Sequence, residues 1–186
     1  MSLLDLDARW RRLHDESRSC PCCGRQFSGL IDLGYDHPDD WPHGHRDDRP
    51  DVQVGGDRLT ADLCRLDGRY FIRCTLPIPI RGSDERFSFG PWAETSEALF
   101  RAYLGTYDDP PGTFEGGPAL LANDLPGFGE IGAALRLEPR DAATRPELFA
   151  EDGPLRDAQT QGLSFDALLD LYAEAGHDIR PHLQQD

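Results

Sequence analysis

The spacing of hydrophobic residues predicts helices near both ends of the chain. Close to the N-terminus, Leu3, Leu6, Trp10 and Leu13 recur at intervals of three and four residues, which places them on one helix face. Ser2 stands where a helix N-cap is expected. The same reasoning predicts helices at 95–104, 154–161 and 164–175.

Alternating residues predict a β-hairpin in the middle of the chain. Asp67-Gly68 is a dipeptide that favours a two-residue turn, and it separates segments rich in aliphatic and aromatic residues. Counting outward from this turn pairs Cys64 with Phe71 and places Cys74 on the opposite face, in the hydrophobic core. The face with Cys64 also carries Asp62, Leu66, Arg69, Phe71 and Arg73. Strands are expected at 59–66, 69–76, 86–92, 119–122 and 133–137.

This order of elements predicts an α+β fold, an antiparallel sheet with flanking helices and an N-terminal zinc-knuckle-like segment, because strands and helices do not alternate regularly. The expected organisation is an N-terminal helix at 1–18, a cysteine knuckle and acidic His/Asp-rich loop at 19–58, a main α+β domain at 59–176 and a tail at 177–186.

Charge restricts the classes of partner. The chain has a formal net charge of -15, and all of its 19 basic residues other than histidine are arginine. Such an acidic protein repels the phosphates of nucleic acids, so we expect no nucleic-acid binding and favour a basic protein as partner. Without a membrane span or a signal peptide in the sequence, we expect no membrane association and a cytoplasmic location.

The most informative motif is Cys20-Pro-Cys-Cys23-Gly24. The Cys-x-x-Cys-Gly spacing lets two thiolates reach one metal ion, and the glycine relieves the tight backbone that follows. Five cysteines in a reducing compartment also favour metal ligands or buried thiols over disulfides. The motif therefore predicts half of a structural zinc site.

The remaining zinc ligands are predicted with less support from spacing. Cys64 is the best candidate for a third ligand, because it falls on what the sequence indicates is the more polar face of the hairpin. His43 and His45 are candidates for the fourth. Two alternatives stay open: the histidine-rich segment holds its own metal, or it is a solvated acidic loop.

A glycine motif matches the sequence pattern of a nucleotide-binding loop but lacks the flanking strand and helix that such a loop requires. Gly127, Gly129 and Gly132 have the G-x-G-x-x-G spacing, but Pro126 precedes them and Pro139 limits any following helix. We therefore interpret them as a turn between two strands.

Several short motifs occur in a fixed order. They are Cys20-x-x-Cys23-Gly24, Leu63-Cys64, Tyr70-Phe71-Ile72-Arg73, Leu76-x-Ile78-Pro79-Ile80, Phe87-x-Phe89-Gly90-x-Trp92, Leu125-Pro126-Gly127-Phe128, Arg145-Pro146 and Pro154-Leu155. In this combination the chain resembles the bacterial domain-of-unknown-function family 2199, from about residue 20 to residue 172. The resemblance implies a shared fold and no particular mechanism.

The chain departs from that family pattern at three places. Cys74 stands where glycine is usual, Gly153 replaces a histidine, and no histidine lies near Phe27. The absence of a histidine near Phe27 removes one candidate for the fourth zinc ligand.

Taken together, the sequence predicts an uncharacterised cytoplasmic bacterial protein that acts as a non-catalytic binding or regulatory module with a structural zinc. The alternatives are a zinc-dependent hydrolase, which would use an open metal position, and a metal-free scaffold for protein interaction.

Overall fold

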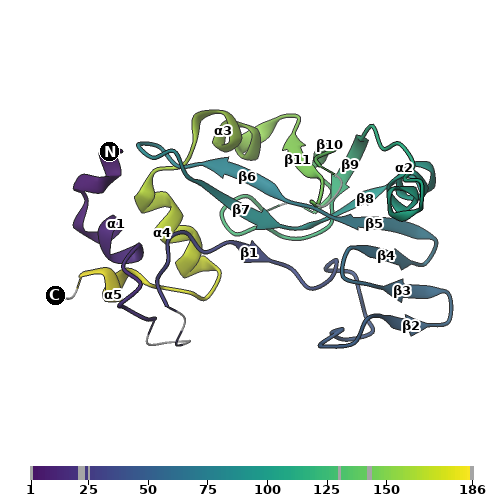
Figure 1. Cartoon of the computed structure of the whole chain (residues 1–186), viewed down its shortest axis with the longest axis horizontal. Helices are drawn as coiled ribbons and strands as arrows, with labels where there is room; N and C mark the ends of the chain where they lie inside the picture. The colour runs from purple at the N-terminus through teal and green to yellow at the C-terminus, as the bar shows by residue number, and fades with distance from the viewer. Residues whose placement is uncertain (1, 21–23, 25, 130, 142–143, 185–186) are drawn as a thin grey trace. The chain divides into compact units, whose positions relative to one another are not determined.

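The computed structural model describes residues 2–20, 24, 26–129, 131–141 and 144–184. The chain divides into two compact units. Unit 1 comprises residues 1–32, 78–87 and 157–186, and unit 2 comprises residues 33–77 and 88–156. Figure 1 shows helices gathered in unit 1 and most strands in unit 2.

Unit 2 is built on an eight-stranded antiparallel sheet with the order β11-β10-β9-β8-β5-β4-β3-β2. Its strands are β2 (Val52–Val54), β3 (Asp57–Leu59), β4 (Leu63–Leu66), β5 (Arg69–Arg73), β8 (Trp92–Thr95), β9 (Gly117–Leu121), β10 (Ala134–Glu138) and β11 (Glu147–Ala150). A second sheet has the order β1-β7-β6 and contains β1 (Leu33–Gly34), β6 (Leu76–Pro79) and β7 (Arg86–Gly90), with β1 parallel to β7. The predicted α+β class with a large antiparallel sheet is confirmed.

The predicted hairpin is present with the predicted register, since Cys64 lies opposite Phe71 across β4 and β5. Asp67 and Gly68 both have positive φ, of 49° and 76°, as a type I′ turn requires. The single strand expected at 59–66 is wrong, because the chain turns between β3 and β4. The Thr60 hydroxyl accepts a hydrogen bond from the Leu63 N–H at 3.0 Å, which stabilises this turn instead of a continuous strand.

Different segments contact the two faces of this hairpin. Helix α2 (Glu97–Leu104) forms within the predicted range and is capped by Ser96, and it places Phe100 against Tyr70 with ring centroids 5.1 Å apart. The irregular segment 35–51 contributes Trp41, only 5% exposed, to a cluster on the other face that includes Cys64 and Phe71. Cys64 is therefore buried in an apolar cluster, although the same face also carries the partly exposed side chains of Asp62 and Arg69.

Unit 1 contains η1 (Leu3–Leu6), α1 (Ala8–Leu13), α4 (Phe165–Glu174) and α5 (Arg180–Gln184), and α3 (Gly153–Gln161) ends in it. The helix predicted at the N-terminus forms in two pieces. Asp7 is extended between them and its carboxylate accepts a hydrogen bond from the Arg9 N–H, so a new helix begins there. The Trp10 ring then packs edge-on against Phe165, with centroids 5.1 Å apart.

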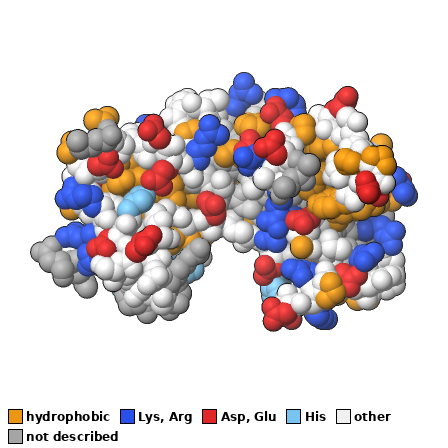
Figure 2. All heavy atoms as spheres, in the orientation of Figure 1, with side chains coloured by type: hydrophobic (Ala, Val, Ile, Leu, Met, Phe, Trp, Pro, Cys, Tyr) orange, Lys and Arg blue, Asp and Glu red, His pale blue; other side chains and the backbone are white. Residues whose placement is uncertain are grey.

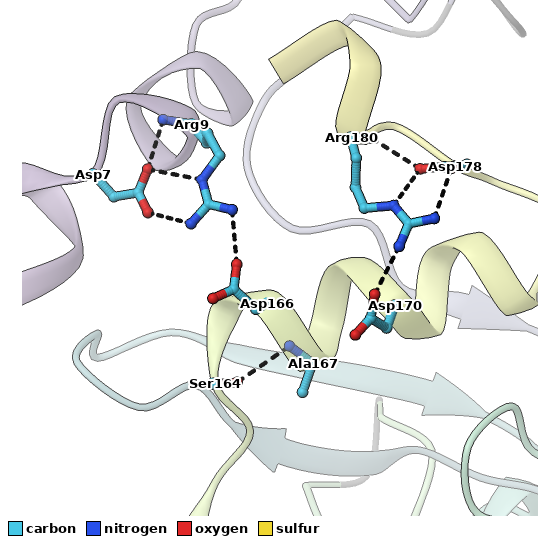
Figure 3. Close-up of polar contacts among 8 residues, drawn as sticks. All are labelled: Asp7, Arg9, Ser164, Asp166, Ala167, Asp170, Asp178 and Arg180. Atoms are coloured by element: carbon cyan, nitrogen blue, oxygen red, sulfur yellow. Dashed lines mark hydrogen bonds and ion pairs between the residues drawn. The ribbon is translucent and has the colours of Figure 1, made fainter. Parts of the chain in front are cut away.

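Arginine side chains connect the helices of unit 1, as Figure 3 shows. Arg9 bridges Asp7 and Asp166, with N–O distances of 2.7 Å to each. Arg180 similarly contacts Asp170 and Asp178 at 2.7 and 2.8 Å. These contacts link α1 to α4, and α5 to α4.

The glycine-rich segment after β9 is a turn, as predicted. Gly129 donates its N–H to the Leu125 carbonyl at 2.8 Å and pairs with it in an isolated bridge. Among the described helices, none is long and apolar enough to span a membrane.

Candidate functional site

The described residues around the cysteine motif form a tight antiparallel turn in unit 1. Ser19 pairs with Gln26, and Phe27 donates its N–H to the Arg18 carbonyl at 2.9 Å. Inside this pair, the Gly24 N–H donates to the Cys20 carbonyl at 2.7 Å. The predicted ligand Cys23, like the neighbouring Cys22, lies outside the described residues.

Gly24 has the backbone conformation for which the sequence motif requires a glycine. Its φ is 71°, in the left-handed region that residues with a Cβ rarely adopt. The side chain of Cys20, one turn earlier, is 1% exposed. A buried sulfur at the start of a closed turn suits a metal thiolate, because the metal compensates the charge that burial disfavours.

Cys64 lies in unit 2, in the cluster beneath Trp41. Burial, together with the nearby carboxylate of Asp57, raises the pKa of the Cys64 thiol to about 12. The thiol is therefore neutral near pH 7 and is a poor nucleophile. A metal ion would have to displace its proton before the sulfur could bind.

His43 and His45 contact different carboxylates. His43 Nε2 lies 2.8 Å from the Asp57 carboxylate, and its ring meets Trp41 edge-on at 4.9 Å. His45 Nδ1 lies 3.7 Å from the Asp36 carboxylate. Hydrogen bonds from the Asp67 N–H and from His43 lower the pKa of Asp57.

Within the part of the chain that the structure describes, no group of three or more histidine, cysteine, aspartate or glutamate residues is arranged to hold a metal ion. The structure thus places Cys64, His43 and His45 in unit 2, and the turn at Cys20 in unit 1. A zinc site that includes Cys23 remains a prediction.

Cys74 is the core thiol that the register predicted. It is fully buried, and its Sγ donates to the Ile72 carbonyl at 3.2 Å. Burial raises the pKa of Cys74 well above its usual value.

Arg73 is a candidate site residue to which the sequence analysis gave no role. It stands at the end of β5 opposite Trp92, and its guanidinium carbon lies 6.0 Å from the centre of that ring. It lines a pocket together with Asp36, His45 and Arg46. The hairpin register had placed Arg73 on the same face as Phe71, but the other residues that line the pocket come from segment 35–51, whose packing no local pattern indicated.

The comparisons with known proteins identify the family. Comparison with curated proteins and with solved structures gave no match. The profile of the family described as "Uncharacterized protein conserved in bacteria (DUF2199)" matches residues 19–163, which is most of the chain. The chain belongs to this family, as its combination of motifs indicated.

Proposed function

We propose that the protein is a non-catalytic binding or regulatory module whose cysteine turn holds a structural zinc ion. The observation that carries the proposal is the turn itself, in which the Gly24 N–H closes onto the Cys20 carbonyl and Gly24 adopts φ 71°. This backbone conformation is what a Cys-x-x-Cys-Gly knuckle needs to direct two sulfurs toward one ion. Closed sites of this type contribute folding free energy.

The state of the thiols in unit 2 supports binding over catalysis. Burial keeps Cys64 and Cys74 protonated, so neither is suited to nucleophilic attack. His43 is engaged by Asp57 and packs on Trp41, and these contacts anchor an irregular segment to the sheet.

Charge supports a basic protein as the partner. The net charge is -15, and Figure 2 shows acidic side chains interspersed with basic ones over the face drawn. An acidic surface attracts a basic partner and repels nucleic acid, and such an association weakens as salt screens it. The proposed setting is the bacterial cytoplasm, where cysteines stay reduced.

Elemental analysis of the purified protein tests the zinc proposal. We expect about one equivalent of zinc, and less than about a tenth in Cys20→Ser and Cys23→Ser. Cys74→Ala is the matched control, because it removes a buried thiol that is not a proposed ligand. It should lower stability while retaining zinc.

Cys64→Ala shows whether the third ligand comes from unit 2. Loss of zinc in this variant but not in Cys74→Ala would assign Cys64 to the site. Absence of zinc from the wild-type protein, with unchanged stability in Cys23→Ser, would contradict the proposal.

A further inference from the structure

Arg73 carries a half-buried charge that forms no hydrogen bond and no ion pair with the described residues. Its guanidinium lies over the Trp92 ring, and its Nε is buried without a hydrogen-bond partner. Arg69, four residues earlier on the same face, is the contrast, since it contacts Asp40 at 2.7 Å and Glu94 at 2.6 Å. Buried arginines normally have such partners, so the arrangement at Arg73 needs an explanation.

The nearby carboxylates are engaged elsewhere. Asp62 pairs with Arg145 at 2.7 Å, and Asp36 lies 3.7 Å from His45. Burial lowers the pKa of Arg73, and the charges of Arg145 and Arg46 lower it further, against the opposing effect of the two aspartates. The surroundings therefore leave the positive charge of Arg73 incompletely compensated.

Arg73 lines a surface pocket in which the side chains of His45, Asp36 and Asp47 are 67%, 74% and 77% exposed. The pocket has a volume of about 270 Å³ and lies entirely within unit 2. Its lining residues are Asp36, His45, Arg46, Asp47 and Arg73.

Two tryptophans fix segment 35–51 to the sheet beside the pocket. Trp92, beneath the guanidinium, donates its indole N–H to the Tyr35 carbonyl at 3.1 Å, which fixes the segment at one side of the pocket. Trp41, buried in the sheet cluster, fixes the same segment further along. Arg73 also packs close to the backbone of Gly34, where a Cβ would lie in van der Waals contact with Nη2 at 3.4 Å.

We propose that this pocket binds the carboxylate group of a small organic acid, with the guanidinium of Arg73 as its main contact and Arg46 as a second cation. A planar guanidinium matches the geometry of a carboxylate and can bind both of its oxygens. Asp36 and Asp47 line the same pocket and would repel the second charge of a phosphate dianion. The small volume favours a small acid over a larger ligand.

Titration of the full-length ¹⁵N-labelled protein with sodium acetate, at constant ionic strength, tests the proposal. The probe resonance is Arg73 Nε–Hε, assigned by its loss in Arg73→Lys. We expect a saturable shift with half-saturation below roughly 20 mM, which corresponds to weak but specific binding. Inorganic phosphate should bind at least about fivefold more weakly.

Variants separate this site from general effects of charge. Arg73→Lys removes the planar fork and should weaken acetate binding at least about tenfold, as followed by backbone amide shifts of residues 45–47. Arg69→Lys is the matched control, since its guanidinium is already paired, and it should leave acetate binding unchanged. If Arg73→Lys does not fold, Arg46→Gln replaces it and should weaken binding at least about threefold.

Three results would overturn the proposal: a shift that stays linear in acetate, tighter binding of phosphate than of acetate, or equal losses in the Arg69 and Arg73 variants. None of them tests the cysteine turn, because the described residues that line the pocket include no cysteine, and the two proposals share only His45, a candidate for the fourth zinc ligand. Conversely, a protein without zinc would still be expected to bind acetate.

Discussion

The fully buried side chain of Asn123 accepts a hydrogen bond at its Oδ1 from the backbone N–H of Trp92, at 2.7 Å. Its Nδ2 donates to the His37 carbonyl at 3.0 Å and to the Asp39 carboxylate at 2.7 Å. One amide thus ties β8 to the irregular segment that carries part of the Arg73 pocket.

Replacement of Asn123 by alanine should therefore destabilise the protein by about 2–4 kcal/mol, because it leaves the buried Trp92 N–H without an acceptor and removes two further hydrogen bonds. Urea unfolding measures the effect. Asp124→Ala is the control, since the neighbouring side chain is exposed and should change stability little. Equal losses in the two variants would show that the amide network is not the cause.

Local patterns predicted much of unit 2. A two-residue turn fixes the register of its hairpin, so the pairing of Cys64 with Phe71 followed from counting alone. Helices α2 and α4 likewise form where the sequence predicted helices, at 95–104 and 164–175, and they begin after the caps Ser96 and Ser164. These features depend on residues close together in the chain.

Contacts between distant segments were not predictable in the same way. Trp41 stands alone among aspartate, proline and glycine residues, so no periodicity indicated that it packs beneath the sheet. For that reason the burial of Cys64 in an apolar cluster was not predicted. The turn at Cys20 followed from local spacing, whereas the ligands that would complete a metal site, and the pocket at Arg73, depend on tertiary packing.

Two glycines with positive φ allow the free-energy cost of backbone strain to be measured separately from the cost of steric overlap. Gly55 has φ 60° with open space around a Cβ, whereas a Cβ on Gly116, at φ 78°, would overlap the Leu137 carbonyl oxygen. Gly55→Ala should cost about 1–2 kcal/mol from backbone strain alone. Gly116→Ala should cost at least twice as much in urea unfolding. Similar costs in the two variants would mean that the backbone near Gly116 shifts to accept the methyl group.

Two variants at the start of α4 compare the contribution of a helix cap with that of an exposed ion pair (Figure 3). The Ser164 hydroxyl accepts a hydrogen bond from the Ala167 N–H at 3.2 Å, so Ser164→Ala should cost about 1 kcal/mol. Asp166 pairs with Arg9 but its side chain is 74% exposed, and pairs of this kind contribute about 0–1 kcal/mol. Thermal unfolding at low and high salt measures both effects. Only the effect of Asp166→Asn should shrink with salt, and a cap effect with equal salt dependence would contradict this assignment.

The thiols of Cys64 and Cys74 should resist modification in the folded protein. Because burial raises the pKa of Cys64 to about 12, only about 10⁻⁴ of it is thiolate at pH 8, and Cys74 is raised as well. Labelling with iodoacetamide at pH 8, followed by peptide mass spectrometry, should leave both unmodified until urea unfolds the chain.

The same raised pKa sets the pH dependence of stability. The folded state holds the Cys64 proton more tightly than the unfolded state, so this contribution is complete below about pH 8.5 and is lost as the pH rises toward 12. Cys64→Ala should therefore lose less stability than the wild-type protein between neutral pH and pH 10.

Repeating the iodoacetamide labelling with EDTA separates two causes of protection, because protection by burial persists after chelation whereas protection by a bound metal does not. Rapid labelling of Cys64 in the chelated, folded protein would show that zinc, and not the Trp41 cluster, shields its sulfur.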